Sequence, residues 1–142
     1  MTPAGPDREV VGRRLRALDD ALADLEILRD VSVDRLRAEP LTRAAAERLL
    51  QVVVDLAIDV NAHLVVTALG RAPATGRESF TLLVDVGAID QELADRLAPS
   101  AGLRNVLVHR YTDIRVELVA AAIGPVLDDF AAYVRAVATH IA

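Results

Sequence analysis

The stretch LLQVVVDLAIDVNAHLVVTAL, residues 49–69, decides the fold of this chain. Its apolar side chains lie on almost every side of a helical wheel. A helix that is apolar nearly all round is buried, either at the centre of a helical bundle or in a subunit interface. Gly70 follows it as a C-terminal stop, and Thr42 is the expected N-cap. We therefore expect one long central helix between Thr42 and Gly70.

The segment before this helix is amphipathic. Residues 7–30 carry apolar side chains at alternating four- and three-residue steps, beginning at Val11, which is the stripe of an amphipathic helix. One more helical turn fits residues 31–39. Pro40 is expected to close that turn, because the residue before a proline avoids helical dihedral angles.

Shorter helices are expected after the central one. Residues 78–86 form a short helix, and Asp90 caps a fourth helix that runs towards Tyr111 with a kink at Pro99. A fifth helix begins with a cap at 112–113 and reaches the C-terminus. Alternation typical of strands is absent from the sequence. The fold class is therefore all-α: an antiparallel bundle of about five helices.

The composition indicates a single folded domain over residues 1–142, with a flexible tail at 1–6. Hydrophobic residues make up 53% of the chain and charged residues 26%. The absence of cysteine excludes disulfides, thiolate metal sites and a cysteine nucleophile. All 16 basic residues are arginine, which excludes Schiff-base lysine chemistry. A net charge of −5 excludes an overall basic coat for nucleic acid but allows a local cluster of arginines.

We expect a soluble, cytoplasmic protein that does not enter a membrane. Residues 1–10 include Asp7, Arg8 and Glu9 and lack the apolar core of a secretory signal. The longest runs without charge, such as residues 60–70, fall well short of the ~20 residues that a membrane span needs.

The run GLRNVLVHRY, residues 102–111, holds the side chains that are best suited to catalysis. On a helical wheel, Arg104, Asn105 and His109 lie away from the apolar face of this helix. A histidine can transfer protons near neutral pH, and the planar fork of an arginine can hold two phosphate oxygens. Arg104 and His109 lie about 140° apart on one helix. Two such helices meeting across a two-fold axis would bring both pairs into one cleft.

The spacing of Arg104, His109 and Tyr111 resembles the R-x4-H-x-Y motif of the HEPN superfamily. More narrowly, residues 102–111 are similar to the HepT toxins, the helical partners of MntA-type minimal nucleotidyltransferase antitoxins. The resemblance implies a toxin that acts as a metal-independent endoribonuclease, without a cofactor, on tRNA or mRNA. It implies catalytic roles for Arg104 and His109, a supporting role for Asn105, and a homodimer with a composite site.

The resemblance also implies how the nuclease is silenced. In the HepT–MntA pairs, the antitoxin transfers AMP from ATP onto the motif tyrosine, which here is Tyr111. An added phosphate beside Arg104 would block substrate RNA. The alternative is that Tyr111 only packs and hydrogen-bonds at the junction of two helices.

Other functions stay open on the residues alone. An arginine and a histidine at a helix end are often surface charges that complement the helix dipole. The chain could be a non-catalytic helical partner that presents substrate or nucleotide to a nucleotidyltransferase, or a plain oligomeric scaffold. The complete motif favours the enzyme, because a scaffold has no need for His109.

A second constellation lies on the central helix, where Gln51, Asp55, Asp59 and His63 form a polar stripe at four-residue spacing. Asp59 and His63 could bind a metal, or the four residues could form a solvated, hydrogen-bonded stripe, or they could line the Arg104 cleft as supporting neighbours. We expect no metal site. The arginines of the first helix are expected to form a solvated face.

The expected homodimer forms through the second and fourth helices. Residues 49–69 are more apolar than one small monomer can hide. The small residues Ser100, Ala101 and Gly102 would allow two copies of the fourth helix to approach closely.

Overall fold

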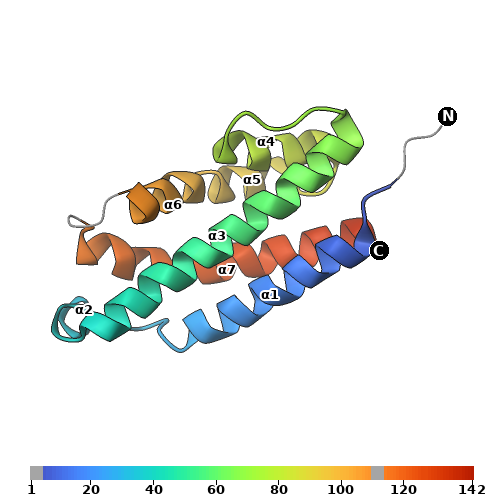
Figure 1. The fold of residues 1–142 in the computed structure, drawn as a ribbon. Helices are drawn as coiled ribbons and strands as arrows, with labels where there is room; N and C mark the ends of the chain where they lie inside the picture. The colour runs from blue at the N-terminus through green and yellow to red at the C-terminus, as the bar shows by residue number, and fades with distance from the viewer. Residues whose placement is uncertain (1–4, 110–113) are drawn as a thin grey trace.

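The computed structural model describes residues 5–109 and 114–142, and every regular element in these ranges is a helix (Figure 1). The seven helices are α1 (Arg8–Glu26), α2 (Val33–Ala38), α3 (Pro40–Leu69), α4 (Gly76–Val86), α5 (Gln91–Leu97), α6 (Ser100–His109) and α7 (Val116–Ile141). The predicted all-α bundle is confirmed, with seven helices in the described ranges where about five were expected.

The helix α3 is the spine of the bundle, as the all-round apolar pattern predicts. It packs against α1, α4, α6 and α7, and its side chains from Leu50 to Val65 supply much of the shared core. By length and hydropathy, α3 is the one helix in the described ranges that could cross a membrane. A core helix can satisfy the same criteria, and the side chains of α3 contribute to the core of this bundle. The expectation that the chain does not enter a membrane stays a prediction.

A buried polar network joins three helices at the centre of the core. The Tyr133 hydroxyl of α7 donates to Asn61 Oδ1 of α3 at 2.6 Å, and Asn61 Nδ2 donates to Ser79 Oγ of α4 at 3.1 Å. Three rings meet edge to face around this network: Phe80, Phe130 and Tyr133. Full burial raises the pKa of Tyr133 well above its ordinary value, because the charged phenolate cannot be solvated there.

Two predicted helix boundaries are wrong for a local reason. Pro40 begins α3 instead of closing the preceding turn, because a first helical residue needs no N–H donor. Thr42 therefore lies inside the helix, where its hydroxyl donates to Glu39 at 2.8 Å, and does not serve as the N-cap. Gly70 ends α3 as predicted, with a φ of 75° that favours glycine.

The C-terminal half also differs in detail. The fourth predicted helix is divided into α5 and α6 by a short turn at residues 98–99, which is a larger interruption than the expected kink at Pro99. The last helix starts at Val116 with Arg115 as its N-cap residue, so neither expected cap, at 112–113, is used. Both of those residues lie outside the described part of the chain. The helix α7 continues through Pro125 to Ile141.

Candidate active site

A cleft of about 390 Å³ opens where α3, α6 and the first turn of α4 meet. It is lined by Asp55, Ile58, Asp59, Gly76, Ala101, Arg104 and Asn105. Gly76 lets α4 approach the cleft closely, because a Cβ atom there would lie 2.9 Å from Ile58 Cδ1 and 3.4 Å from Ala101 Cβ. Three of the predicted site residues, Arg104, Asn105 and Asp59, share this cavity.

Arg104 is held in this cleft by a carboxylate from the central helix. Its Nε donates to Asp55 Oδ1 at 2.6 Å, and its Nη1 lies 3.4 Å from Asn105 Oδ1. Both members of the ion pair are about one-third exposed, at 32% for Arg104 and 34% for Asp55. Asp55 and Asn105 together use only part of the donor capacity of the guanidinium, so N–H groups remain for a phosphate, which suits a planar donor.

Asp55 is itself braced by a neighbour on α3. Gln51 Nε2 lies 3.5 Å from Asp55 Oδ2, one turn earlier on the helix. The sequence places Asp55 in the polar stripe, but its role as the partner of Arg104 was not predicted. A four-residue spacing shows only that residues share one face of the same helix. It does not show a contact between two helices, such as this one between positions 49 residues apart.

His109 does not line the same cleft. It is an exposed residue in the last turn of α6, five residues beyond Arg104 and therefore about 7.5 Å further along the helix axis. Within one chain, Arg104 and His109 therefore do not share a cavity. Tyr111, and with it the predicted modification site, lies outside the described residues.

The two other candidate residues of the polar stripe are separated. Asp59 is exposed and lines the cleft next to Asp55, as expected of a supporting residue. His63 does not line it. Its Nε2 accepts a hydrogen bond at 3.0 Å from the backbone N–H of Asp7, the residue that caps α1. His63 therefore ties the start of α1 to α3, and a supporting role for it at the cleft stays a prediction.

Metal binding finds no support in the described ranges. Residues 5–109 and 114–142 contain no group of three or more histidine, aspartate or glutamate side chains that could hold an ion. Asp59 and His63, the pair considered from the sequence, are used differently, because His63 Nε2 already accepts the Asp7 N–H. Metal independence stays a prediction.

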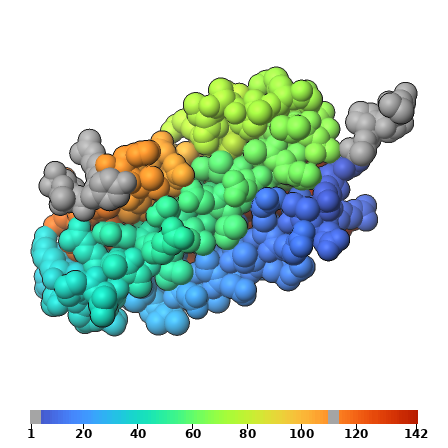
Figure 2. Space-filling model, viewed as in Figure 1, coloured from blue at the N-terminus to red at the C-terminus, as the bar shows by residue number. Residues whose placement is uncertain are grey.

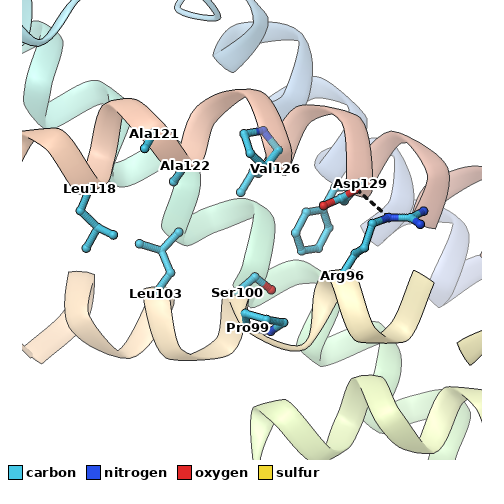
Figure 3. A pocket seen from close by; sticks show the side chains of 11 residues that line it. Arg96, Pro99, Ser100, Leu103, Leu118, Ala121, Ala122, Val126 and Asp129 are labelled. Atoms are coloured by element: carbon cyan, nitrogen blue, oxygen red, sulfur yellow. Dashed lines mark hydrogen bonds and ion pairs between the residues drawn. The ribbon is translucent and has the colours of Figure 1, made fainter. Parts of the chain in front are cut away.

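The opposite side of α6 is apolar and faces α7. A groove of about 250 Å³ lies between them, and Figure 3 shows Leu103 of α6 facing Ala121 and Ala122 of α7. An ion pair of 3.1 Å between Arg96 and Asp129 borders one end of the groove. The helix α6 therefore has two distinct faces, one that borders the groove beside α7 and one that presents Arg104 to the cleft.

The fold and the cleft define a class of protein. It is a small helical bundle that presents an arginine, an amide and a histidine on one helix, and these groups suit phosphodiester chemistry. The chain belongs to the ribonuclease HepT-like family, whose model matches residues 18–137. The family and the fold class predicted from the sequence are both confirmed.

Two curated relatives carry nuclease names. The chain is 33% identical over 132 residues to a tRNA nuclease HepT of Aphanizomenon flos-aquae, which covers 93% of this chain and 90% of the relative. It is also 33% identical over 88 residues to an mRNA nuclease HepT of Shewanella oneidensis, covering 62% of this chain and 63% of the relative. The predicted activity, cleavage of RNA, agrees with the family and with both names.

Solved structures show the same fold. A tri-AMPylated HEPN toxin of Shewanella oneidensis, solved in complex with its MNT antitoxin, superposes with a TM-score of 0.80. The match covers 92% of this chain and 97% of that chain at 22% sequence identity. At this identity the likeness establishes the helical architecture alone.

Proposed function

We propose that this chain is the toxin of a toxin–antitoxin pair and cleaves tRNA or mRNA as an endoribonuclease. The observation that carries the proposal is the position of Arg104 in the α3–α6 cleft, with its Nε held 2.6 Å from Asp55 Oδ1 and further N–H donors available for a phosphate. Family membership and the names of two relatives support the same activity.

The residues supply the groups that RNA cleavage without a metal needs. A base must take the proton of the 2′-hydroxyl, an acid must protonate the leaving 5′-oxygen, and a cation must stabilise the charged phosphorane. His109 is the proton-transfer group, since imidazole changes its charge near neutral pH. Arg104 is the cation, and Asn105, an exposed neighbour on the cleft wall, is the supporting donor to phosphate or imidazole.

A homodimer completes this site in the proposal. Arg104 and His109 of one chain are separated along α6, so one phosphate would be served by groups from two α6 helices across a two-fold axis. Of the small residues expected at that contact, Ser100 and Ala101 are buried within the chain, and Gly102 alone is exposed. Gly102 is therefore the position where two α6 helices would approach most closely.

The proposed partner is a nucleotidyltransferase antitoxin of the MntA type. It would silence the nuclease by transferring AMP to the Tyr111 hydroxyl, two positions beyond the end of α6. The solved relative is an AMPylated toxin bound to its antitoxin, which supports this partner. A phosphodiester on Tyr111 would compete with RNA for Arg104.

Cleavage by purified variants tests the activity. A tRNA pool and an mRNA transcript are incubated with wild type, His109→Ala and His140→Ala, with and without a chelator. His140 is the matched control, because it is also an exposed histidine in the last turn of a helix. We expect His109→Ala to lose about 10²–10⁴-fold in rate and His140→Ala to retain activity.

Two results would contradict the proposal. Unchanged cleavage by His109→Ala would remove the assigned proton-transfer residue. Loss of wild-type cleavage in the chelator would show that the reaction depends on a metal.

A further inference from the structure

The charges of α1 are unevenly distributed along the helix. Four arginines occupy its first half: Arg8, Arg13, Arg14 and Arg16. The same half holds one carboxylate, Glu9, in the first turn after the Asp7 N-cap. The second half carries four carboxylates and no cation: Asp19, Asp20, Asp24 and Glu26. The excess of positive charge on α1 is therefore confined to residues 8–16.

The four arginines are also without ion-pair partners in the described part of the chain. Arg8, Arg13 and Arg16 are exposed, and none of the four has a described carboxylate within ion-pair distance. Some other arginines are paired: Arg43 of α3, Arg71 in the loop before α4, and Arg96 of α5 each pair with a carboxylate. The first half of α1 thus presents an excess of positive charge, four arginines against the single carboxylate of Glu9.

Gly12 shapes this surface. Arg16 Nη1 lies 3.5 Å from the place that a Cβ atom of Gly12 would occupy. The guanidinium of Arg16 therefore folds back over Gly12, one turn towards the start of the helix and towards Arg8. A glycine inside a helix is unfavourable relative to alanine, and here the absence of a side chain leaves room for the Arg16 guanidinium.

The cleft cannot bind a polyanion strongly by its own charge. Its described lining holds one cation, Arg104, and two carboxylates, Asp55 and Asp59. Affinity for RNA comes largely from neutralised phosphates, so a nuclease with this cleft needs further cations along the path of the strand.

The first half of α1 lies close enough to the cleft to contact an RNA strand that is bound there. The hydrogen bond from Asp7 N–H to His63 Nε2 fixes the start of α1 against α3. His63 and Asp55 share one face of α3 and are separated by eight residues, or about 12 Å along the helix axis. Figure 2 shows the start of α1 (blue) bordering α3 (green) on one face of the molecule.

We propose that residues 8–16 of α1 form a second RNA-binding surface, which holds the phosphate backbone of a strand whose scissile phosphate lies at Arg104. The inference rests on the proposed nuclease function and adds to it the place where substrate affinity arises. Recognition through phosphates is independent of base sequence and depends strongly on salt.

Binding to labelled RNA in the inactive His109→Ala background tests this surface. The probe is a fluorescein-labelled single-stranded RNA of mixed sequence, measured by anisotropy over a series of salt concentrations. We expect Arg13→Gln/Arg16→Gln to weaken binding on the order of tenfold. The slope of log K against log salt should fall by about 0.7 for each phosphate that the variant no longer neutralises.

Two matched variants separate local charge from other effects. Arg48→Gln/Arg135→Gln removes the same charge from exposed positions on α3 and α7 and should bind RNA almost as wild type does. Arg13→Lys/Arg16→Lys keeps the charge and should restore most of the affinity and the slope. Equal thermal unfolding of all variants confirms that each is folded.

The outcomes distinguish this inference from the proposed function. If wild type cleaves RNA but Arg13→Gln/Arg16→Gln binds the probe as tightly as its control, the α1 surface is overturned and the nuclease stands. If the double variant binds RNA normally but loses the nucleotidyltransferase, the surface serves a protein, and the RNA assignment is overturned as well. If wild type cleaves no RNA, the proposed function fails, whatever the binding series shows.

Discussion

Asp55 and Arg104 lie 49 residues apart in the sequence, and their side chains meet at 2.6 Å where α3 crosses α6. The carboxylate binds the Nε edge of the guanidinium, which restrains the plane of the fork and leaves other N–H donors for a ligand in the cleft. Asp55 is therefore a positioning residue for Arg104 in the proposed reaction. It also lowers the positive charge of the cleft, so its two effects on RNA have opposite signs.

The first prediction separates these two effects. In Asp55→Ala, Arg104 loses its orientation, and kcat for RNA should fall by about 10²-fold, as expected for a misplaced catalytic group. KM should stay equal or decrease, because a repelling carboxylate has been removed. Steady-state cleavage assays give both constants, and Asp59→Ala, which removes an exposed carboxylate of the same cleft, is the control. A rise in KM without a change in kcat would contradict the positioning role.

The second prediction concerns Tyr133 and alkaline pH. The pKa of its buried hydroxyl is raised in the folded chain, whereas an unfolded tyrosine ionises at a pKa of about 10. Above that pH the unfolded chain releases a proton that the folded chain keeps, so the free energy of unfolding decreases as pH rises further. The decrease should approach about 1.4 kcal/mol per pH unit, measured by urea unfolding.

Tyr133→Phe provides the control for that experiment. The variant should lose this alkaline dependence. It should also be destabilised by about 1–3 kcal/mol at neutral pH, because Asn61 Oδ1 loses its hydrogen-bond donor inside the core. An alkaline slope that persists in Tyr133→Phe would show that other groups cause it.

The third prediction tests the close approach at the cleft. In Gly76→Ala, the new methyl group would lie 2.9 Å from Ile58 Cδ1, so α4 must shift or Ile58 must repack. The expected cost is about 1–3 kcal/mol of stability, with reduced cleavage because Arg104 shares this cavity. Gly124→Ala is the control, since a Cβ atom there meets nothing within 4 Å. Equal unfolding curves for both variants would rule out the tight contact.

The sequence predicts the elements of this fold better than the contacts between them. Residues 49–69 identify the central helix, and Gly70 adopts the positive φ expected of a helix stop. Pro40 shows a limit of local signals, because proline is equally suited to follow one helix and to begin the next. The Asp55–Arg104 pair shows another, since it depends on how α3 and α6 cross, which no spacing within one helix reveals.

The fourth prediction concerns the homodimer. Wild type should sediment as a dimer at micromolar concentration. Gly102→Gln places a long side chain on the exposed face of α6, where a Cβ atom meets nothing within 4 Å of the same chain. The monomer should therefore remain folded, while close approach of two α6 helices is blocked and cleavage is lost together with the dimer. Gly124→Gln on α7 is the control. A monomeric wild type that cleaves RNA would exclude the composite site.

The fifth prediction concerns Tyr111 and the antitoxin. Incubated with its cognate nucleotidyltransferase, ATP and Mg²⁺, the chain should gain the mass of one or more AMP units. In the first transfer, the Tyr111 oxygen would attack the α-phosphate of ATP, lose its proton and release pyrophosphate. The resulting phosphodiester would offer Arg104 charge-assisted hydrogen bonds worth about 1.5–3 kcal/mol each, in competition with RNA.

Tyr111→Phe separates silencing from catalysis. The variant should gain no mass but keep most of its nuclease activity, because the proposed reaction gives the Tyr111 hydroxyl no proton to transfer. The nucleotidyltransferase could then restrain the nuclease only by binding to it. Intact-mass spectrometry and cleavage assays on both proteins provide the measurement, and Tyr133→Phe, whose hydroxyl is buried in the core, is the control that should still be modified. Equal mass gain in wild type and Tyr111→Phe would place the modification elsewhere. An unmodified wild type that the antitoxin still inhibits would leave occlusion of the cleft as the mechanism of silencing.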